Sequence, residues 1–158
     1  MYPLGRRILF RREVIVMAKN QMLNSAKGRK TVLCIEDDRD VLELLQIIFE
    51  QEGYHWVGAF GGRAGLHTAQ SLKPDLILLD IMMPDMNGWE VYARVKSDVE
   101  LRHIPVMILT VRDARWDRQL ALQGAQVADY VTKPFTPDNL ICRARQVLEN
   151  WYHLNNPG

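Results

Sequence analysis

Residues 75–80 read Asp-Leu-Ile-Leu-Leu-Asp, so four apolar residues stand in an unbroken run between two aspartates. A strand that exposes one face to water alternates apolar and polar residues, whereas a strand inside a parallel sheet is covered on both faces. Residues 76–79 show no alternation. The run therefore predicts a buried strand of a parallel sheet.

Other short apolar runs recur along the chain, and stretches of helical period lie between them. We expect strands at Thr31–Ile35, His55–Phe60, Asp75–Leu79, Ile104–Leu109 and Asp129–Thr132. A first helix has an apolar face formed by Val41, Leu44, Leu45 and Ile48, and the last helix has one formed by Leu140, Ala144, Val147, Leu148 and Trp151. Pro137 and Asp138 suit the first turn of that last helix. Five strands alternating with five helices predict an α/β fold, a doubly wound five-stranded parallel sheet.

The composition is that of an ordinary globular protein. The 158 residues suffice for one domain with a core, and 47% of them are apolar and 25% charged. No apolar run approaches the roughly 18 residues that span a bilayer, and arginines interrupt the apolar stretches where a signal peptide would lie. Both cysteines, Cys34 and Cys142, lie in apolar runs and are expected to be buried thiols. These features predict a cytoplasmic protein.

Charge divides the chain into unequal parts. Residues 1–30 carry eight lysines and arginines against one glutamate, whereas the rest carries twelve basic and eighteen acidic residues. We interpret residues 1–30 as a basic, disordered N-terminal extension, residues 31–151 as the folded domain, and residues 152–158 as a C-terminal tail. A basic arm can also bind nucleic acid or an anionic membrane surface, and this alternative stays open. We recognise no DNA-binding domain.

Acidic residues follow two of the predicted strands. Strand one leads into Glu36-Asp37-Asp38, and strand three leads into Asp80. Because chemistry in open α/β sheets gathers at the carboxyl ends of the strands, we expect these carboxylates to converge on one crevice. Such carboxylates repel unless a cation neutralises them, and an all-oxygen set suits Mg²⁺. The alternative is that an acidic residue here caps the next helix, a role that we assign to Asp38.

Two further polar residues are expected at the same edge of the sheet. Strand four leads into Thr110, and strand five leads into Lys133. A carboxylate nucleophile, an acidic metal pair, a hydroxyl and a lysine are the parts that phosphoryl transfer requires. Taken singly, Thr110 would more often be a strand-end hydroxyl and Lys133 a solvated charge.

In this order and at this spacing, the motifs of the chain resemble the receiver domains of two-component response regulators, over about residues 31–151. The resemblance rests on Val32-Leu33-Cys34-Ile35-Glu36-Asp37-Asp38, on Asp80 with Met83-Pro84-Asp85-Met86-Asn87-Gly88, on Leu109-Thr110, and on Tyr130-Val131-Thr132-Lys133-Pro134-Phe135. It implies a CheY-like, flavodoxin-like (βα)5 fold with strand order 2-1-3-4-5. It also implies a phosphorylation-activated switch rather than an enzyme with a separate substrate, although such domains promote their own phosphorylation and slow autodephosphorylation.

The resemblance assigns a role to each site residue. Asp80 would accept a phosphoryl group from a sensor histidine kinase or a phosphotransfer protein. Asp37 would bind Mg²⁺ directly and Glu36 through a coordinated water, and Asp80 and the backbone carbonyl of Met82 would complete the protein ligands. Lys133 would pair with the acyl phosphate, with a cis bond to Pro134.

Activation would follow from a coupled movement. Thr110 would turn toward the phosphoryl oxygens and Tyr130 would follow it inward, which would remodel the surface of helix four, strand five and helix five. A downstream protein partner, which the sequence does not name, would dock there, and the resemblance also allows a homodimer through this surface.

Some features depart from the family pattern or suggest other functions. Val111 stands where a smaller alanine is usual, so we expect it to narrow access to Asp80. Residues 124–130 include more residues than the family pattern has there, so the sequence does not fix the residue at which helix four ends. The main alternative is a receiver-like binding module that works without phosphorylation. A haloacid-type phosphohydrolase is excluded because Asp80-Ile81-Met82 lacks the second aspartate of an Asp-x-Asp motif.

Overall fold

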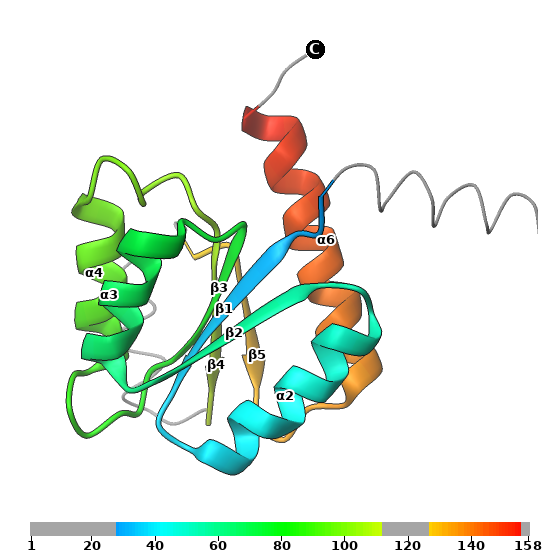
Figure 1. Cartoon of the computed structure of the whole chain (residues 1–158), viewed down its shortest axis with the longest axis horizontal. Coiled ribbons are helices and arrows are strands. Elements are labelled where there is room, and N and C mark those ends of the chain that lie inside the picture. Colours follow the sequence, from blue (N-terminus) through cyan, green and yellow to red (C-terminus); the bar gives the residue numbers. More distant parts are fainter. Residues whose placement is uncertain (1–27, 112–126, 156–158) are drawn as a thin grey trace, which may run out of the picture.

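The computed structural model describes residues 28–111 and 127–155, in which five strands alternate with helices (Figure 1). The strands are β1 (Thr31–Glu36), β2 (His55–Phe60), β3 (Leu76–Asp80), β4 (Val106–Thr110) and β5 (Asp129–Thr132), and the helices are α2 (Arg39–Gln51), α3 (Gly62–Leu72), α4 (Gly88–Ser97) and α6 (Pro137–Asn155). The helix expected between β4 and β5 falls on residues 112–126, outside the described ranges. None of the described helices is long and apolar enough to cross a membrane.

The strands form one sheet in the order β2-β1-β3-β4-β5, and every neighbouring pair is parallel. This confirms the predicted α/β class and the strand order that the resemblance implies. Two strands, β2 and β5, were predicted with the correct bounds. The strands β1, β3 and β4 each end one residue later than predicted, at Glu36, Asp80 and Thr110, and β3 and β4 also begin later, at Leu76 and Val106. The sheet therefore includes the first acidic residues of the expected site.

Helices cover both faces of the sheet, with α3 and α4 on one side and α2 and α6 on the other (Figure 1). Alternate residues of β3 enter two separate cores: Ile77 and Leu79 pack under α3 and α4, and Leu76 and Leu78 pack under α2 and α6. All four side chains are fully buried. The two-sided cover explains why residues 76–79 show no polar alternation.

The residues at the N-terminal ends of α2 and α6 are of types that favour the start of a helix. Asp38 is the N-cap of α2, and its side chain accepts hydrogen bonds from the backbone N–H groups of Asp40 and Val41. This confirms the capping role that we assigned to it. As predicted, α6 begins at Pro137 with Asp138 in its first turn, and it continues past Trp151 to Asn155.

Two expectations about burial were wrong. Leu44 was placed on the apolar face of α2, but it is 51% exposed, while Leu45 and Ile48 are buried. Apolar spacing alone does not say which of the adjacent residues Leu44 and Leu45 faces the sheet. Cys34 is buried in β1 as expected, but Cys142 is exposed because α6 turns the neighbouring Ile141 toward the core instead.

Lys30, the last residue of the basic extension, contacts the sheet. Its carbonyl oxygen accepts a hydrogen bond from the backbone N–H of His55 (2.9 Å), and its Nζ lies 3.1 Å from Oδ1 of Asp75. The ammonium also lies 5.9 Å from the ring centroid of Tyr152 on α6. Lys30 therefore lies beside the C-terminal turns of α6.

Candidate functional site

The register of the sheet brings the predicted site residues to one edge. Ile35 pairs with Leu79, so Glu36 at the end of β1 lies level with Asp80 at the end of β3. Thr110 ends β4, where it pairs with Thr132 of β5, and Lys133 directly follows that pair. Because all five strands are parallel, these residues lie at the same carboxyl edge, where α/β proteins place their chemistry.

Three carboxylates form the acidic cluster of the site. Glu36, Asp37 and Asp80 each offer an oxygen, and these oxygens lie within 4.8 Å of one another. Glu36 and Asp80 are buried and Asp37 is partly buried. Burial and the neighbouring Asp80 raise the pKa of Glu36, and burial and the neighbouring Glu36 raise the pKa of Asp37. Burial and the neighbouring carboxylates therefore disfavour the ionised forms of Glu36 and Asp37, and a bound cation would favour these forms.

Lys133 supplies the positive charge beside this cluster. Its Nζ lies 2.6 Å from Oε2 of Glu36 and 3.6 Å from Oδ2 of Asp80. Burial alone would lower the pKa of Lys133, but the hydrogen bond to Glu36 and the charges of both carboxylates outweigh burial, so the pKa is raised. The bond between Lys133 and Pro134 is cis, as the resemblance implies. Lys133 therefore stays an ammonium that can pair with an anion at Asp80.

The two oxygens of Glu36 are already engaged. Oε1 accepts hydrogen bonds from the backbone N–H groups of Asp37 (3.1 Å) and Asp38 (3.2 Å), and Oε2 accepts one from Lys133. This arrangement leaves Glu36 poorly placed for a direct metal bond. Asp37 and Asp80 are the carboxylates better placed to bind a hard cation such as Mg²⁺, which prefers one or two protein carboxylates and keeps several waters.

The loop that follows Asp80 is folded tightly against it. The backbone N–H of Met82 donates to Oδ1 of Asp80 (3.1 Å), and that of Gly88 donates to the carbonyl oxygen of Ile81 (3.0 Å). A Cβ on Gly88 would lie only 2.3 Å from the carbonyl oxygen of Asp80 and 2.5 Å from Cα of Ile81. Glycine is therefore required at the start of α4, since any side chain would push the backbone of Asp80 away.

Asp85, in the same loop, caps a neighbouring helix. The N-cap residue of α3 is Gly61, which has no side chain to bind the first N–H groups of the helix. The carboxylate of Asp85 accepts hydrogen bonds from the backbone N–H groups of Gly62 (3.1 Å) and Arg63 (3.2 Å), and these bonds lower the pKa of Asp85. Asp85 and Gly88 belong to the sequence motif that follows Asp80, but their structural roles were not predicted.

The two expected switch residues lie on adjacent strands. Thr110 is buried, and its Oγ1 donates to the carbonyl oxygen of Val111 (3.4 Å). Tyr130 on β5 is 39% exposed, and the guanidinium of Arg143 lies 5.8 Å from its ring centroid. Met82 and Val111 are also exposed, so apolar side chains are present on the surface of the loops that follow β3 and β4.

A comparison with known proteins agrees with this geometry. A family model described as the response regulator receiver domain matches residues 32–145. The chain is 36% identical, over 120 residues, to the alkaline phosphatase synthesis transcriptional regulatory protein PhoP of Bacillus subtilis (strain 168). That match covers 75% of this chain and 48% of the relative, so the chain spans about half the length of this curated relative.

Solved structures show the same fold. A putative response regulator from Chloroflexus aurantiacus J-10-fl is 27% identical, with a TM-score of 0.71 over 77% of this chain and 99% of that one. The signal receiver domain of a signal transduction histidine kinase from Syntrophus aciditrophicus is 30% identical, with a TM-score of 0.70 over 77% of this chain and 91% of that one.

Proposed function

Since the chain belongs to the family of response regulator receiver domains, we propose that it is a signalling switch that accepts a phosphoryl group on Asp80. The observation that carries the proposal is the placement of Asp80, a buried carboxylate 3.6 Å from the ammonium of Lys133 and beside Glu36 and Asp37. The donor is the phosphohistidine of a sensor histidine kinase or of a phosphotransfer protein.

The chemistry is an exchange of one bond to phosphorus. An oxygen of Asp80 attacks the phosphorus atom, a P–O bond forms, and the P–N bond to the donor imidazole breaks. The leaving nitrogen keeps the electron pair of that bond and takes up a proton. Catalysis of this step is mainly positioning and neutralisation of the phosphoryl oxygens. Lys133 neutralises one of these oxygens, and the hydroxyl of Thr110 donates a hydrogen bond to another.

A divalent cation fits the remaining donors. Asp37 and Asp80 would hold Mg²⁺ directly with the backbone carbonyl of Met82, and Glu36 would act through a coordinated water because both of its oxygens have other partners. Bound Mg²⁺ supplies positive charge for the attacking carboxylate and the transferring group. Without a cation, burial and Asp80 raise the pKa of Glu36, and burial and Glu36 raise the pKa of Asp37.

The output of the switch is a change at the surface of β5 and α6. Thr110 moves toward the new phosphoryl oxygens, and Tyr130 takes the space that Thr110 leaves. Arg143 on α6 contacts the ring of Tyr130 and also binds Asp129 with two bonds of 2.7 Å, so movement of Tyr130 is transmitted to α6. A partner protein or a second copy of the chain reads this surface together with the helix expected in residues 112–126.

Incubation with acetyl phosphate and Mg²⁺, followed by intact-mass measurement, tests the assignment of Asp80. We expect the wild-type chain to gain one phosphoryl group, and this group to be removed by hydroxylamine, which cleaves acyl phosphates. Asp80→Asn should gain none because an amide is not a nucleophile for this step.

A matched control comes from the same loop. Asp85→Asn removes a carboxylate that caps α3 but does not belong to the acidic cluster, so it should still gain the phosphoryl group. If folded wild-type protein gains no phosphate from acetyl phosphate or phosphoramidate, the proposal is wrong and the phosphorylation-independent binding module takes its place. Equal labelling of Asp80→Asn would show that another residue is the acceptor.

A further inference from the structure

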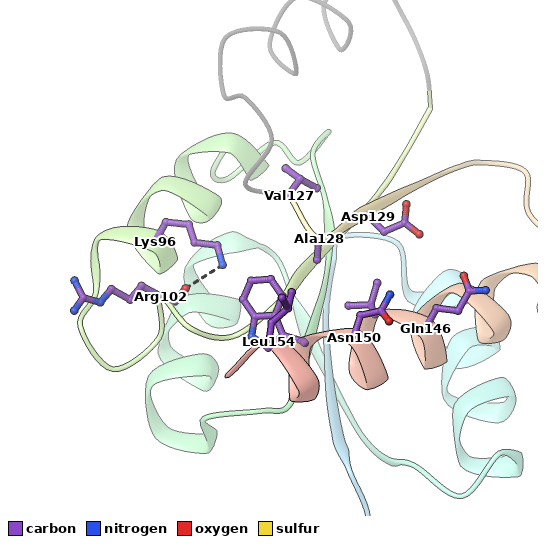
Figure 2. Close-up of a pocket in the computed structure, with 10 residues that line it drawn as sticks. Lys96, Arg102, Val127, Ala128, Asp129, Gln146, Asn150 and Leu154 are labelled. Carbon is purple, nitrogen blue, oxygen red and sulfur yellow. Dashed lines mark hydrogen bonds between the residues drawn. The ribbon is translucent and has the colours of Figure 1, made fainter. Parts of the chain in front are cut away.

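A hollow with a volume of about 520 Å³ lies at the end of the sheet opposite Asp80. Its walls are the end of α4, the turn that leads to β4, the residues that lead into β5, and the last turns of α6 (Figure 2). The backbone N–H of Ala128 in its floor donates to the carbonyl oxygen of Val106, the first residue of β4. The hollow is therefore separate from the phosphorylation site, and its volume is within the range of small-molecule sites.

Lys96 is a half-buried cation in one wall of the hollow. Its Nζ donates to the carbonyl oxygens of Ile104 (2.8 Å) and Arg102 (3.2 Å), and Figure 2 shows the second of these bonds. An ammonium has three N–H donors, and among the described residues two carbonyls accept from Lys96, which leaves the third donor for a ligand. Burial lowers the pKa of Lys96. An anion in the hollow would stabilise the charged form that burial disfavours.

The acidic residue at the hollow does not compete for Lys96. The two carboxylate oxygens of Asp129 each lie 2.7 Å from the guanidinium of Arg143, which neutralises them. Two other polar side chains among the lining residues, Gln146 and Asn150, are uncharged amides on α6, and the guanidinium of Arg102 points away from the hollow in Figure 2. The charge that remains at the hollow is positive, which favours an anionic ligand.

The rest of the lining is apolar and includes an aromatic ring. Val127, Ala128, Val147 and Leu154 line the hollow together with Trp151. The ring of Trp151 is held in place because its Nε1 donates to the carbonyl oxygen of His103, and the ammonium of Lys96 lies 5.5 Å from its centroid. One ligand could therefore place an apolar body against the Trp151 ring and an anionic group on Lys96.

We propose that this hollow, the α4–α6 pocket, binds a small amphipathic anion: a carboxylate or sulfonate carried on an aromatic body. The proposal does not depend on phosphorylation of Asp80. Recognition comes from the third N–H donor of Lys96 for the anionic group and from Trp151, Val127 and Val147 for the ring. A neutral molecule of the same shape keeps the apolar contacts but loses the charged hydrogen bond.

Titration of the full chain with 1-naphthoate, followed by ¹H–¹⁵N NMR, tests the proposal, with 1-naphthamide as the neutral match. We expect a saturable shift of the Trp151 indole N–H, a signal that Trp151→Phe identifies by its disappearance. Naphthamide should bind at least about tenfold more weakly, since a hydrogen bond to a charged group is worth more than a neutral one. Asp80→Asn should bind naphthoate like the wild type, which separates this site from the proposed function.

Two variants make the test specific. Lys96→Met should weaken naphthoate about tenfold and leave naphthamide unchanged, whereas Lys73→Met, a control at a lysine outside the pocket, should change neither. Because Lys96 also binds two carbonyl oxygens, Lys96→Met could lose stability, so Asn150→Trp serves as a second variant. This exposed residue of α6 can fill the hollow without disturbing those carbonyls, and the variant should abolish binding. The proposal is wrong if millimolar naphthoate does not saturate the shift of the Trp151 signal, or if naphthamide binds as tightly as naphthoate. It is also wrong if Lys96→Met and Asn150→Trp bind naphthoate as tightly as the wild type.

Discussion

At the scale of single residues, the sequence predicted that Glu36, Asp80 and Lys133 lie together, but not which partners the two oxygens of Glu36 would bind. Position in the sequence places Glu36 at a strand end beside Asp80. Its two oxygens, however, are taken by the backbone N–H groups of Asp37 and Asp38 and by the ammonium of Lys133, which is 97 residues away. Such contacts depend on the path of the folded backbone, and no residue pattern contains them. The same limit applies to Gly88, whose close approach to the backbone of Asp80 appears only in three dimensions.

The unequal roles of the three carboxylates lead to a prediction for Mg²⁺. We expect Mg²⁺ to raise the melting temperature of the wild-type chain, because binding at one hundred times the dissociation constant stabilises the native state by about 2.7 kcal/mol. In Asp37→Ala this rise should disappear, while the metal-free melting temperature should stay equal or increase. The second effect is expected because burial and, after it, the neighbouring Glu36 raise the pKa of Asp37, so removal of this carboxylate relieves both desolvation and repulsion.

Thermal unfolding with and without MgCl₂ measures both effects. Asp40→Asn is the matched control, since Asp40 is an exposed acidic residue in the first turn of α2 and lies outside the acidic cluster. This variant should keep the full response to Mg²⁺. A response of wild-type size in Asp37→Ala would remove Asp37 from the metal ligands.

At the scale of helices and strands, the periodicity of the sequence was a good guide because each face of the sheet is covered. The bounds of β2 and β5 were predicted correctly, whereas the predicted fourth strand began at Ile104, before the observed start of β4 at Val106. Its apolar residue Ile104 is buried in a turn rather than in the sheet, and burial alone does not distinguish the two. The start of α3 was beyond prediction for another reason: its cap, Asp85, comes from a loop more than twenty residues later.

The cap of α3 gives a prediction about stability and pH. Asp85→Ala should lower the free energy of unfolding at pH 7 by about 1 kcal/mol, the usual cost of losing a helix N-cap. Backbone hydrogen bonds hold the pKa of Asp85 below its ordinary value. Because the folded-state pKa lies below that of the unfolded chain, about 3.9, the contribution of the carboxylate is present above that pH. It is lost as the pH falls through the lowered pKa.

Urea unfolding of wild-type and Asp85→Ala proteins at a series of pH values from 7 down to 3 measures the difference. We expect the two curves to converge at the acidic end. Asp85→Asn, which keeps an oxygen acceptor but not the charge, should lose less stability than Asp85→Ala at pH 7. A difference that stays constant with pH would mean that Asp85 stabilises the fold through packing of its loop and not through its charge.

At the scale of the whole molecule, Lys30 is the first residue that contacts the sheet in the part of the chain that the structure describes. Lys30 binds β2 through its carbonyl oxygen and Asp75 through its ammonium. Before it lie two short apolar runs, Ile8-Leu9-Phe10 and Val14-Ile15-Val16-Met17, separated by arginines. Runs of this length offer little apolar area against the entropy of ordering, about 1–2 kcal/mol per residue. We therefore expect residues 1–27 to contribute nothing to the stability of the domain.

Two deletions test this boundary. A variant that lacks residues 1–27 should keep the melting temperature and the rate of phosphorylation by acetyl phosphate. A variant that lacks residues 1–30 should melt at a lower temperature, because the backbone N–H of His55 loses its acceptor and Asp75 loses its ion pair. The ion pair is exposed and worth at most about 1 kcal/mol. Most of the loss of stability should therefore come from the missing backbone hydrogen bond at the start of β2. If deletion of residues 1–27 alone lowers the melting temperature, the apolar runs dock on the domain. If only the full chain binds nucleic acid or anionic vesicles, residues 1–27 are instead a second binding element. Its affinity should fall with added salt, because salt screens the contacts between arginines and phosphates.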